Sequence, residues 1–356
     1  MMENQAFASM RIHMWEKEFI KPGQWERMID AENYEAALEI LKETRFGALF
    51  PEDDANFTLS EVLKRELQKQ ADAVLDLVKE PALKRLLFLR YDYHNLKILV
   101  KASTEPDRFS ALFFPFGSLF LPNVKKQILA KKTFGKASRA EEAAVHAAKI
   151  WDETEDAQKV DSILDRAYFE DMHELSAKTG SIFFKAYARE ITDFTNLLSF
   201  FRARWQNQPR HFLTEVFLPG GSISLSDLLS SRLASPAQDD GKDSLSGVSM
   251  ENLLAMLHRG GASTVTTQAW EQFGHDGDIN ALEKARDRVA LQLAEEGGRR
   301  ESGEALLFAY IVKVRTEIQD LNIILGGKRI GLSPEEITSH VRCAASAMQL
   351  ERSSHA

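Results

Sequence analysis

The chain has 356 residues, of which 44% are apolar, and a formal net charge of −8 at pH 7. This length suggests two or three domains, and the apolar content is ample for packed cores. The acidic balance argues against nucleic acid as a partner, because phosphate binding needs a concentrated basic surface. Cys343 is the only cysteine, which excludes an intramolecular disulfide and a cysteine-rich zinc site and favours a reducing compartment such as the cytoplasm.

A helix is predicted near the start of the chain, over residues 33–47. Apolar residues recur at i, i+1, i+4 and i+5 counted from Ala36, which places them on one helical face. Gly47 stands where a helix C-cap is expected. The segment is therefore typical of an amphipathic helix.

The longest uncharged apolar stretch covers residues 111–124 and is interrupted by prolines and a glycine. It is too short for a membrane-spanning helix, which needs about 20 apolar residues. Any contact of the chain with a membrane is therefore expected to be peripheral. The aromatic residues near this turn are a candidate contact surface, with burial inside their own domain as an equal alternative: Phe113, Phe114, Phe116 and Phe120.

The middle of the chain is predicted to be helical. Residues 122–209 and 236–334 contain proline only at their ends, and proline interrupts helices. Between residues 135 and 180 there is no glycine, and Ala, Glu, Lys and Leu are frequent, so we predict one or two long helices there. Only Ile223 and Leu225 hint at a short extended piece. The predicted fold class is all α.

Two breaks and one helix start are predicted in the last third of the chain. Residues 235–244 are polar and rich in turn formers, which indicates a linker and a domain boundary. Residues 297–303 contain three glycines and are predicted to form a loop between two helices. Ser333-Pro334-Glu335-Glu336 has the pattern of an N-cap, a proline at the first helical position and acids in the first turn.

One short phrase occurs three times on predicted helices, as Asp92-Tyr93-His94-Asn95-Leu96, Asp193-Phe194-Thr195-Asn196-Leu197 and Glu317-Ile318-Gln319-Asp320-Leu321. The intervals between the copies are too long for a solenoid unit and suit a domain. We therefore predict three related helical domains at residues 1–125, 126–234 and 235–356. The repeat signature consists of Asp92, Asn95, Leu96, Asp193, Asn196, Leu197, Glu317, Asp320 and Leu321.

Each copy of the phrase places two polar groups beside a core leucine, because residues three and four apart share a helical face. Buried polar groups need hydrogen-bond partners, so we predict that these carboxylates and amides bond to helix ends or basic partners within their own unit. A second shared element follows the first two copies, as Pro115-Phe116-Gly117-Ser118 and Pro219-Gly220-Gly221-Ser222. The third unit has Gly331-Leu332-Ser333-Pro334 instead.

The sequence contains no local catalytic or metal-binding motif. Asp92 and His94 are two apart and point to different sides of a helix, and there is no His-Glu-x-x-His zinc motif. Residues 326–333 contain glycines and Lys328 without the spacing of a phosphate-binding P-loop. We therefore expect no catalytic, cofactor-binding or metal-binding residues. A hydrolase whose acids and histidines gather from distant helices stays open as an alternative.

Tyr91-Asp92-Tyr93-His94-Asn95-Leu96-Lys97 resembles the hallmark of the C subunit of bacterial and archaeal V/A-type ATPases, known as the d subunit in eukaryotic vacuolar enzymes. Further segments are similar to that family in the same order along the chain. They are residues 34–38 followed by Thr44-Arg45-Phe46-Gly47, then residues 164–169, and finally residues 321–328 with the segment that follows. The resemblance covers almost the whole chain.

The resemblance implies three helical domains in a pseudo-threefold funnel, forming a non-catalytic subunit without a cofactor on the cytoplasmic face of a membrane. This subunit would be a collar between the proteolipid rotor ring and the central stalk, touching the membrane only through its partner subunits. It would transmit torque during ATP-coupled H+ or Na+ transport, with the ion, the direction of the reaction and the ring size left open. The alternative is a soluble all-α scaffold that binds other proteins.

Overall fold

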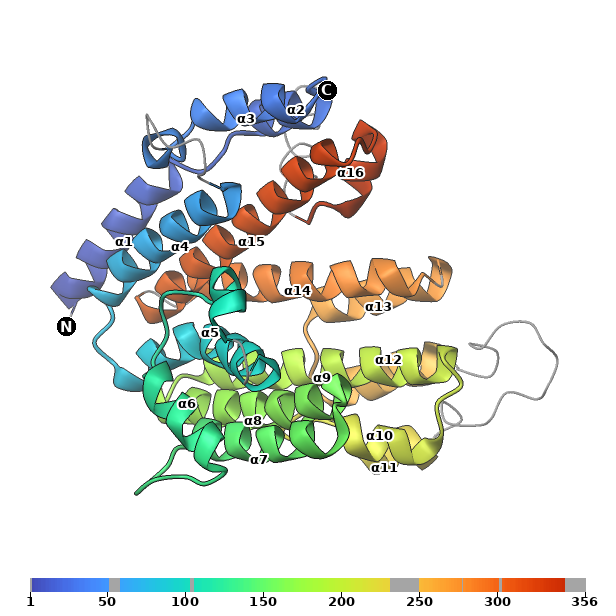
Figure 1. The fold of residues 1–356 in the computed structure, drawn as a ribbon. Helices are drawn as coiled ribbons and strands as arrows, with labels where there is room; N and C mark the ends of the chain where they lie inside the picture. Colours follow the sequence, from blue (N-terminus) through green and yellow to red (C-terminus); the bar gives the residue numbers. More distant parts are fainter. Residues whose placement is uncertain are drawn as a thin grey trace. The chain divides into compact units, whose positions relative to one another are not determined.

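The computed structural model describes residues 2–50, 58–102, 106–230, 250–276, 278–300 and 303–342. Sixteen α-helices and two short 3-10 helices lie in these ranges, and none of the described residues is in a β-strand (Figure 1). The all-α prediction is confirmed. The chain divides into two compact units, one made of Met1–Lys79 with Asp287–Ala356 and the other of Glu80–Arg286.

The first unit is assembled from both ends of the chain around one long helix. That helix is α15 (Glu304–Arg329), and its apolar residues are buried on several sides because α1, α2, α3, α4 and α16 pack against it. The other elements of this unit are α1 (Met2–Glu16), α2 (Pro22–Asp30), α3 (Tyr34–Lys42), η1 (Gly47–Leu49), α4 (Leu59–Leu75) and α16 (Pro334–His340). Helix α14 (Ile279–Arg300) spans the boundary between the two units.

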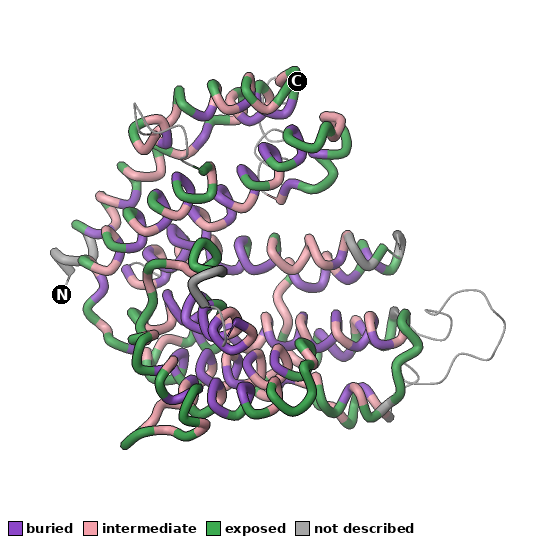
Figure 2. The backbone as a smooth tube through the Cα atoms, viewed as in Figure 1, coloured by how far each residue is buried: buried purple, intermediate pink, exposed green. Residues whose placement is uncertain are grey.

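The second unit is a continuous stretch of chain. Its elements are α5 (Pro81–Lys101), η2 (Pro106–Leu112), α6 (Leu121–Ala130), α7 (Arg139–Thr154), α8 (Ala157–Lys178), α9 (Ile182–Trp205), α10 (Arg210–Val216), α11 (Leu225–Ser230), α12 (Met250–Arg259) and α13 (Thr264–Asp276). Helices α5, α7 and α8 pack against one another, and Figure 2 shows buried residues running along them. Small residues of α7, including Ala140, Ala144 and Ala147, are buried in this core and let the helices approach closely.

Local signals place several helix ends where the sequence predicts them. The region between residues 135 and 180 forms the two long helices α7 and α8, separated at Glu155, whose φ of 50° ends α7. Ser333 caps α16 and forms a capping box with Glu336, which confirms that prediction. These ends depend on hydrogen bonds between residues close in sequence, which is why local patterns predict them.

Two glycines that the sequence assigns to chain breaks have a different role in the structure. Gly47 is not the C-cap of α3, which ends at Lys42, and a Cβ at Gly47 would lie 2.0 Å from the Lys42 carbonyl oxygen. Helix α14 continues through residues 297–300 instead of forming a loop, and a Cβ at Gly298 would lie only 3.1 Å from Ala309 of α15. Gly47 therefore lets the chain turn back against the end of α3, and Gly298 serves close packing of α14 against α15.

The extended piece suggested by Ile223 and Leu225 is also wrong. Leu225 begins α11, and Ile223 lies in the bend before it. The polar linker at residues 235–244 and the single cysteine at position 343 lie outside the described residues. The three-domain division at residues 125 and 234, and the pseudo-threefold funnel, stay predictions.

Candidate functional site

The first copy of the repeated phrase lies on α5 and holds a loop through its backbone. The Asp92 carboxylate accepts hydrogen bonds from the Ser118 N–H at 2.7 Å, the Leu119 N–H at 3.1 Å and the Ser118 hydroxyl at 2.5 Å. Asn95 donates to the Phe114 carbonyl at 3.0 Å and accepts from the Phe114 N–H at 2.9 Å. Two buried side chains therefore fix both ends of the 114–119 loop.

The second copy, on α9, holds another loop with the same types of group: an aspartate binds a serine and the next N–H, and an asparagine binds one backbone residue. Asp193 accepts from the Ser222 N–H at 3.0 Å, the Ser222 hydroxyl at 2.6 Å and the Ile223 N–H at 3.0 Å. Asn196 exchanges two hydrogen bonds of 2.8 Å with the backbone of Leu218. The second shared element of the sequence is thus the loop that the phrase binds.

A glycine precedes the bound serine in both loops because the carboxylate lies against its Cα. A Cβ at Gly117 would lie 2.4 Å from Asp92 Oδ1, and a Cβ at Gly221 would lie 2.2 Å from Asp193 Oδ1. Any side chain at these positions would displace the carboxylate. The Gly-Ser pair is therefore part of the site.

The third copy, on α15, is built differently. Asp320 accepts from the Arg342 N–H at 2.8 Å, and Arg342 follows Asp320 at the same 22-residue interval that separates Leu218 from Asn196. Gly331-Leu332-Ser333-Pro334, which the third unit has in place of the shared loop element, leads into α16, where Ser333 is the N-cap. The residue docked on the third phrase is Arg342, and the chain beyond it lies outside the described residues.

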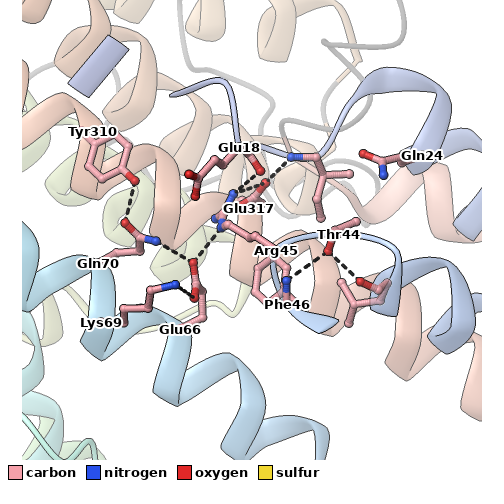
Figure 3. Close-up of polar contacts among 12 residues, drawn as sticks. Glu18, Gln24, Thr44, Arg45, Phe46, Glu66, Lys69, Gln70, Tyr310 and Glu317 are labelled. Atoms are coloured by element: carbon pink, nitrogen blue, oxygen red, sulfur yellow. Dashed lines mark hydrogen bonds and ion pairs between the residues drawn. The ribbon is translucent and has the colours of Figure 1, made fainter. Parts of the chain in front are cut away.

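Glu317 of the third copy joins a buried ion-pair network (Figure 3). Arg45 forms ion pairs with Glu317 and with Glu66, the latter at 2.7 Å. The Ile20 N–H also donates to Glu317, at 2.8 Å. The network continues through hydrogen bonds of 2.7 Å from Gln70 to Glu66 and from the Tyr310 hydroxyl to Gln70.

One guanidinium faces two buried carboxylates in this network, and the pKa values of Glu317 and Arg45 are shifted there. Burial, with a smaller contribution from Glu66, raises the pKa of Glu317 to about 7, although Arg45 and the Ile20 N–H oppose the rise. Burial would lower the pKa of Arg45, but the two carboxylates outweigh it and raise that pKa. The folded protein therefore holds the proton of Glu317 more tightly than an exposed glutamate would.

All nine signature residues are buried. The three leucines, Leu96, Leu197 and Leu321, have no exposed surface. Burial raises the pKa of Asp92, and the hydrogen bonds from Ser118 and Leu119 oppose that rise. The sequence did not assign roles to Arg45, Glu66, Gln70 or Tyr310, because Arg45 bonds to Glu66 across 21 residues and Tyr310 to Gln70 across 240 residues.

The aromatic residues of the 113–120 segment divide into two groups. Phe114 and Phe116 pack against Tyr91 at ring-centre distances of 4.8 and 4.6 Å, so they belong to their own domain. Phe120 is 72% exposed. Packing within the domain is therefore confirmed for Phe114 and Phe116, and a contact role for the exposed Phe120 stays a prediction.

The candidate metal or acid-base pair of Asp92 and His94 is not brought together in the structure. Within them, no group of three or more His, Cys, Asp and Glu side chains is placed to hold a metal ion. His94 points away from Asp92, toward the Leu112 carbonyl at 3.2 Å and the Phe114 ring. The helices in this part of the chain also include none that is long and apolar enough to cross a membrane.

Fold and site together define an all-α protein whose repeated buried sites bind its own loops. Residues 8–340 match the model of the ATP synthase (C/AC39) subunit family, and the chain belongs to that family. It is 23% identical over 330 residues to the C subunit of the V-type sodium ATPase of Enterococcus hirae, covering 92% of this chain and 94% of that protein.

Two further relatives have similar coverage. The C subunit of the A-type ATP synthase of Methanocaldococcus jannaschii is 21% identical over 353 residues, covering 94% of this chain and 85% of that protein. The C subunit of the V-type ATP synthase of Thermus thermophilus is 23% identical over 363 residues, covering 96% of this chain and 100% of that protein. The chain is therefore a subunit of a V/A-type rotary ATPase, as the sequence resemblance predicts.

Proposed function

We propose that this chain is the non-catalytic central-rotor subunit of a V/A-type ATPase. It forms a collar between the membrane proteolipid ring and the central stalk on the cytoplasmic side, and its attachment to the membrane comes through the ring. In this position it transmits torque during ATP-coupled H+ or Na+ transport. The pseudo-threefold funnel built from three related domains belongs to the same proposal.

The observation that carries this proposal is the family match over residues 8–340, with relatives that are C subunits matched along nearly their whole length. A match that runs through the entire folded region supports the same place in the complex, rather than a shared domain in a different protein. The signature residues fit a structural role, because every polar side chain among them has a partner within the chain.

The repeated sites suit a subunit under mechanical load. In each of the first two copies, an aspartate and an asparagine bind four backbone N–H groups or carbonyls and one hydroxyl of the loop. Buried, fully bonded polar groups rigidify the packing around them. We propose that the nine signature residues keep loops and helices in fixed register while the subunit carries torque.

Affinity capture tests the proposed position. The tagged chain, expressed in its own host, is captured from membranes in mild detergent, and its companions are identified by mass spectrometry. We expect the proteolipid ring, the stalk subunits and the catalytic subunits in one complex. A folded chain recovered with none of them, in a host that makes this ATPase, would contradict the collar and favour the protein-binding scaffold.

A further inference from the structure

A surface on α6 and the turn after it combines exposed apolar side chains with lysines. We call it the basic aromatic surface and define it by Phe120, Lys126, Leu129, Lys132, Phe134 and Lys136, all of which are exposed. Lys126 and Leu129 are three apart and lie on one helical face. The opposite face of α6, with Val124 and Ile128, is buried in the core of the second unit.

The turn that carries Phe134 is tied to the interior by hydrogen bonds. The Phe134 N–H donates to the side-chain oxygen of Gln127 at 3.1 Å, and Gln127 in turn donates to Glu141 at 2.7 Å. Gln127 is buried, so the turn is tied to the interior through its backbone while the Phe134 ring is 45% exposed. Figure 2 shows this turn largely in the colours of exposed and intermediate residues.

The charge of this region is opposite to that of the whole chain. Residues 108–140 contain seven basic residues and no Asp or Glu, whereas the chain carries a formal net charge of −8. Lys131 forms an ion pair with Asp152, and Arg139 forms ion pairs with acids of α8. The lysines of the basic aromatic surface have no such acidic partner among the ion pairs found in the described residues.

We propose that the basic aromatic surface binds the anionic headgroup region of a phospholipid bilayer. Apolar side chains interspersed with lysines are typical of proteins that lie on a membrane, where the rings enter the headgroup boundary and the lysines meet anionic lipids. Lysine is depleted at the centre of protein interfaces, where arginine is favoured. Leu129, Phe120 and Phe134 are separated by lysines, which fits a lipid surface better than an acidic protein.

This inference goes beyond the proposed function, because it gives the chain a membrane contact of its own in addition to the one through the ring. It also fits the absence of a spanning helix among the described residues. A subunit beside a membrane-embedded ring would meet headgroups at its margin. The contact would restrain tilting of the subunit, while the ring supplies most of the attachment.

The test is co-sedimentation of the purified chain with vesicles, without any other subunit. Vesicles of phosphatidylcholine mixed with phosphatidylglycerol are compared with vesicles of phosphatidylcholine alone. We expect binding to the anionic vesicles that weakens as salt is added, and much weaker binding to the neutral ones. The Lys126→Gln, Lys132→Gln double variant should bind the anionic vesicles roughly tenfold or more weakly, and Phe120→Ser, Phe134→Ser should also lose binding.

Two matched controls test whether binding depends on this surface or only on the number of lysines and exposed aromatic residues in the chain. Lys17→Gln with Lys79→Gln removes the same charge from exposed positions of the other compact unit, and Trp205→Ser removes an exposed aromatic residue at the end of α9. Both should bind as the unchanged chain does. Helical circular dichroism and the melting temperature confirm that each variant is folded.

No binding of the folded chain to anionic vesicles would overturn the proposal, as would binding that the surface variants leave intact. Variants that lose capture of ATPase subunits without any vesicle binding would assign the surface to an acidic protein partner instead. The vesicle assay and the capture assay can fail independently, so the lipid contact and the collar are tested separately.

Discussion

The side-chain amides of Asn196 and Asn95 each form two hydrogen bonds with a single backbone residue. Each accepts from an N–H and donates to the carbonyl of the same residue, Leu218 or Phe114. An amide side chain presents both the donor and the acceptor that these two backbone groups need. Asp320 stands at the equivalent place in the third copy and accepts a hydrogen bond from the Arg342 N–H.

We expect Asn196→Leu to lower the free energy of unfolding by about 2 kcal/mol or more, because the N–H and the carbonyl of Leu218 would remain buried without partners. Urea unfolding followed by circular dichroism measures this loss. Binding of other subunits by the remaining folded protein should stay unchanged.

Thr195→Ala is the matched control, since the Thr195 hydroxyl bonds only within its own helix, to Ile191. It should change stability by less than about 0.5 kcal/mol. Weakened binding of Asn196→Leu to partners, with unchanged unfolding, would instead place Asn196 at an interface.

The raised pKa of Glu317 predicts that the stability of the folded protein changes with pH in a definite direction. Its pKa of about 7 in the folded protein lies above the ordinary 4.5, so the folded state binds the proton more tightly. The contribution of Glu317 to the free energy of unfolding therefore decreases as the pH rises from about 4.5 to 7. The stability of the unchanged chain relative to Glu317→Gln should fall over this range, by up to about 3 kcal/mol.

Urea unfolding of both proteins between about pH 5 and pH 8, roughly the range over which Glu317 titrates, measures this difference. Glu61→Gln is the control: the Thr58 N–H lowers the pKa of Glu61, so its contribution is lost only as the pH falls below that range. If the stability of the unchanged chain relative to Glu317→Gln instead rose with pH, Arg45 would outweigh burial and hold the Glu317 carboxylate ionised.

At the scale of elements, the repeating piece is a long helix with a docked loop. Helix bounds depend on local signals, and the cap at Ser333 is predicted from such a signal, while Ser138 and Asp156 cap α7 and α8 in the structure. The docking of a loop depends on contacts 19 to 30 residues away, for which sequence periodicity carries no signal. The shared Pro-x-Gly-Ser pattern was visible, but its attachment to the phrase required the structure.

Gly221→Ala should detach the second loop from α9, because the new Cβ would take the place of Asp193 Oδ1. We expect a loss of about 2 kcal/mol in stability and faster hydrogen exchange at the Ser222 and Ile223 amides. Gly326→Ala is the matched control, as no atom lies within 4 Å of its added Cβ. This control should stabilise α15 by about 0.5 to 1 kcal/mol. If the Ser222 and Ile223 amides exchanged as slowly in Gly221→Ala as in the unchanged chain, the carboxylate would not be what holds the loop.

At the scale of the whole molecule, the chain joins its two ends in one compact unit. The contacts that do this include Ile20 with Glu317, Glu16 with Lys313 and Gln70 with Tyr310. No local pattern in the sequence marks these pairings, because each partner alone resembles an ordinary polar residue of a helix. The three repeated phrases predict related pieces in series, and this division stays a prediction beside the two compact units.

The continuous unit, residues 80–286, should fold by itself, because it contains its own core and both Asp-x-x-Asn sites with their loops. We expect the excised fragment to be helical and to unfold cooperatively by circular dichroism and calorimetry. A fragment that is helical but melts without a cooperative transition would mean that the two units depend on each other for folding.

The coupling of ATP hydrolysis to ion transport tests most directly whether the chain is a torque-transmitting collar. ATP hydrolysis and ATP-driven ion uptake are measured in membrane vesicles from host cells that lack the chain, before and after the purified chain is added back. We expect hydrolysis by the catalytic head without ion uptake in its absence, and uptake restored by the chain. Ion uptake that is equally strong without the chain would contradict a role in linking the ring to the stalk.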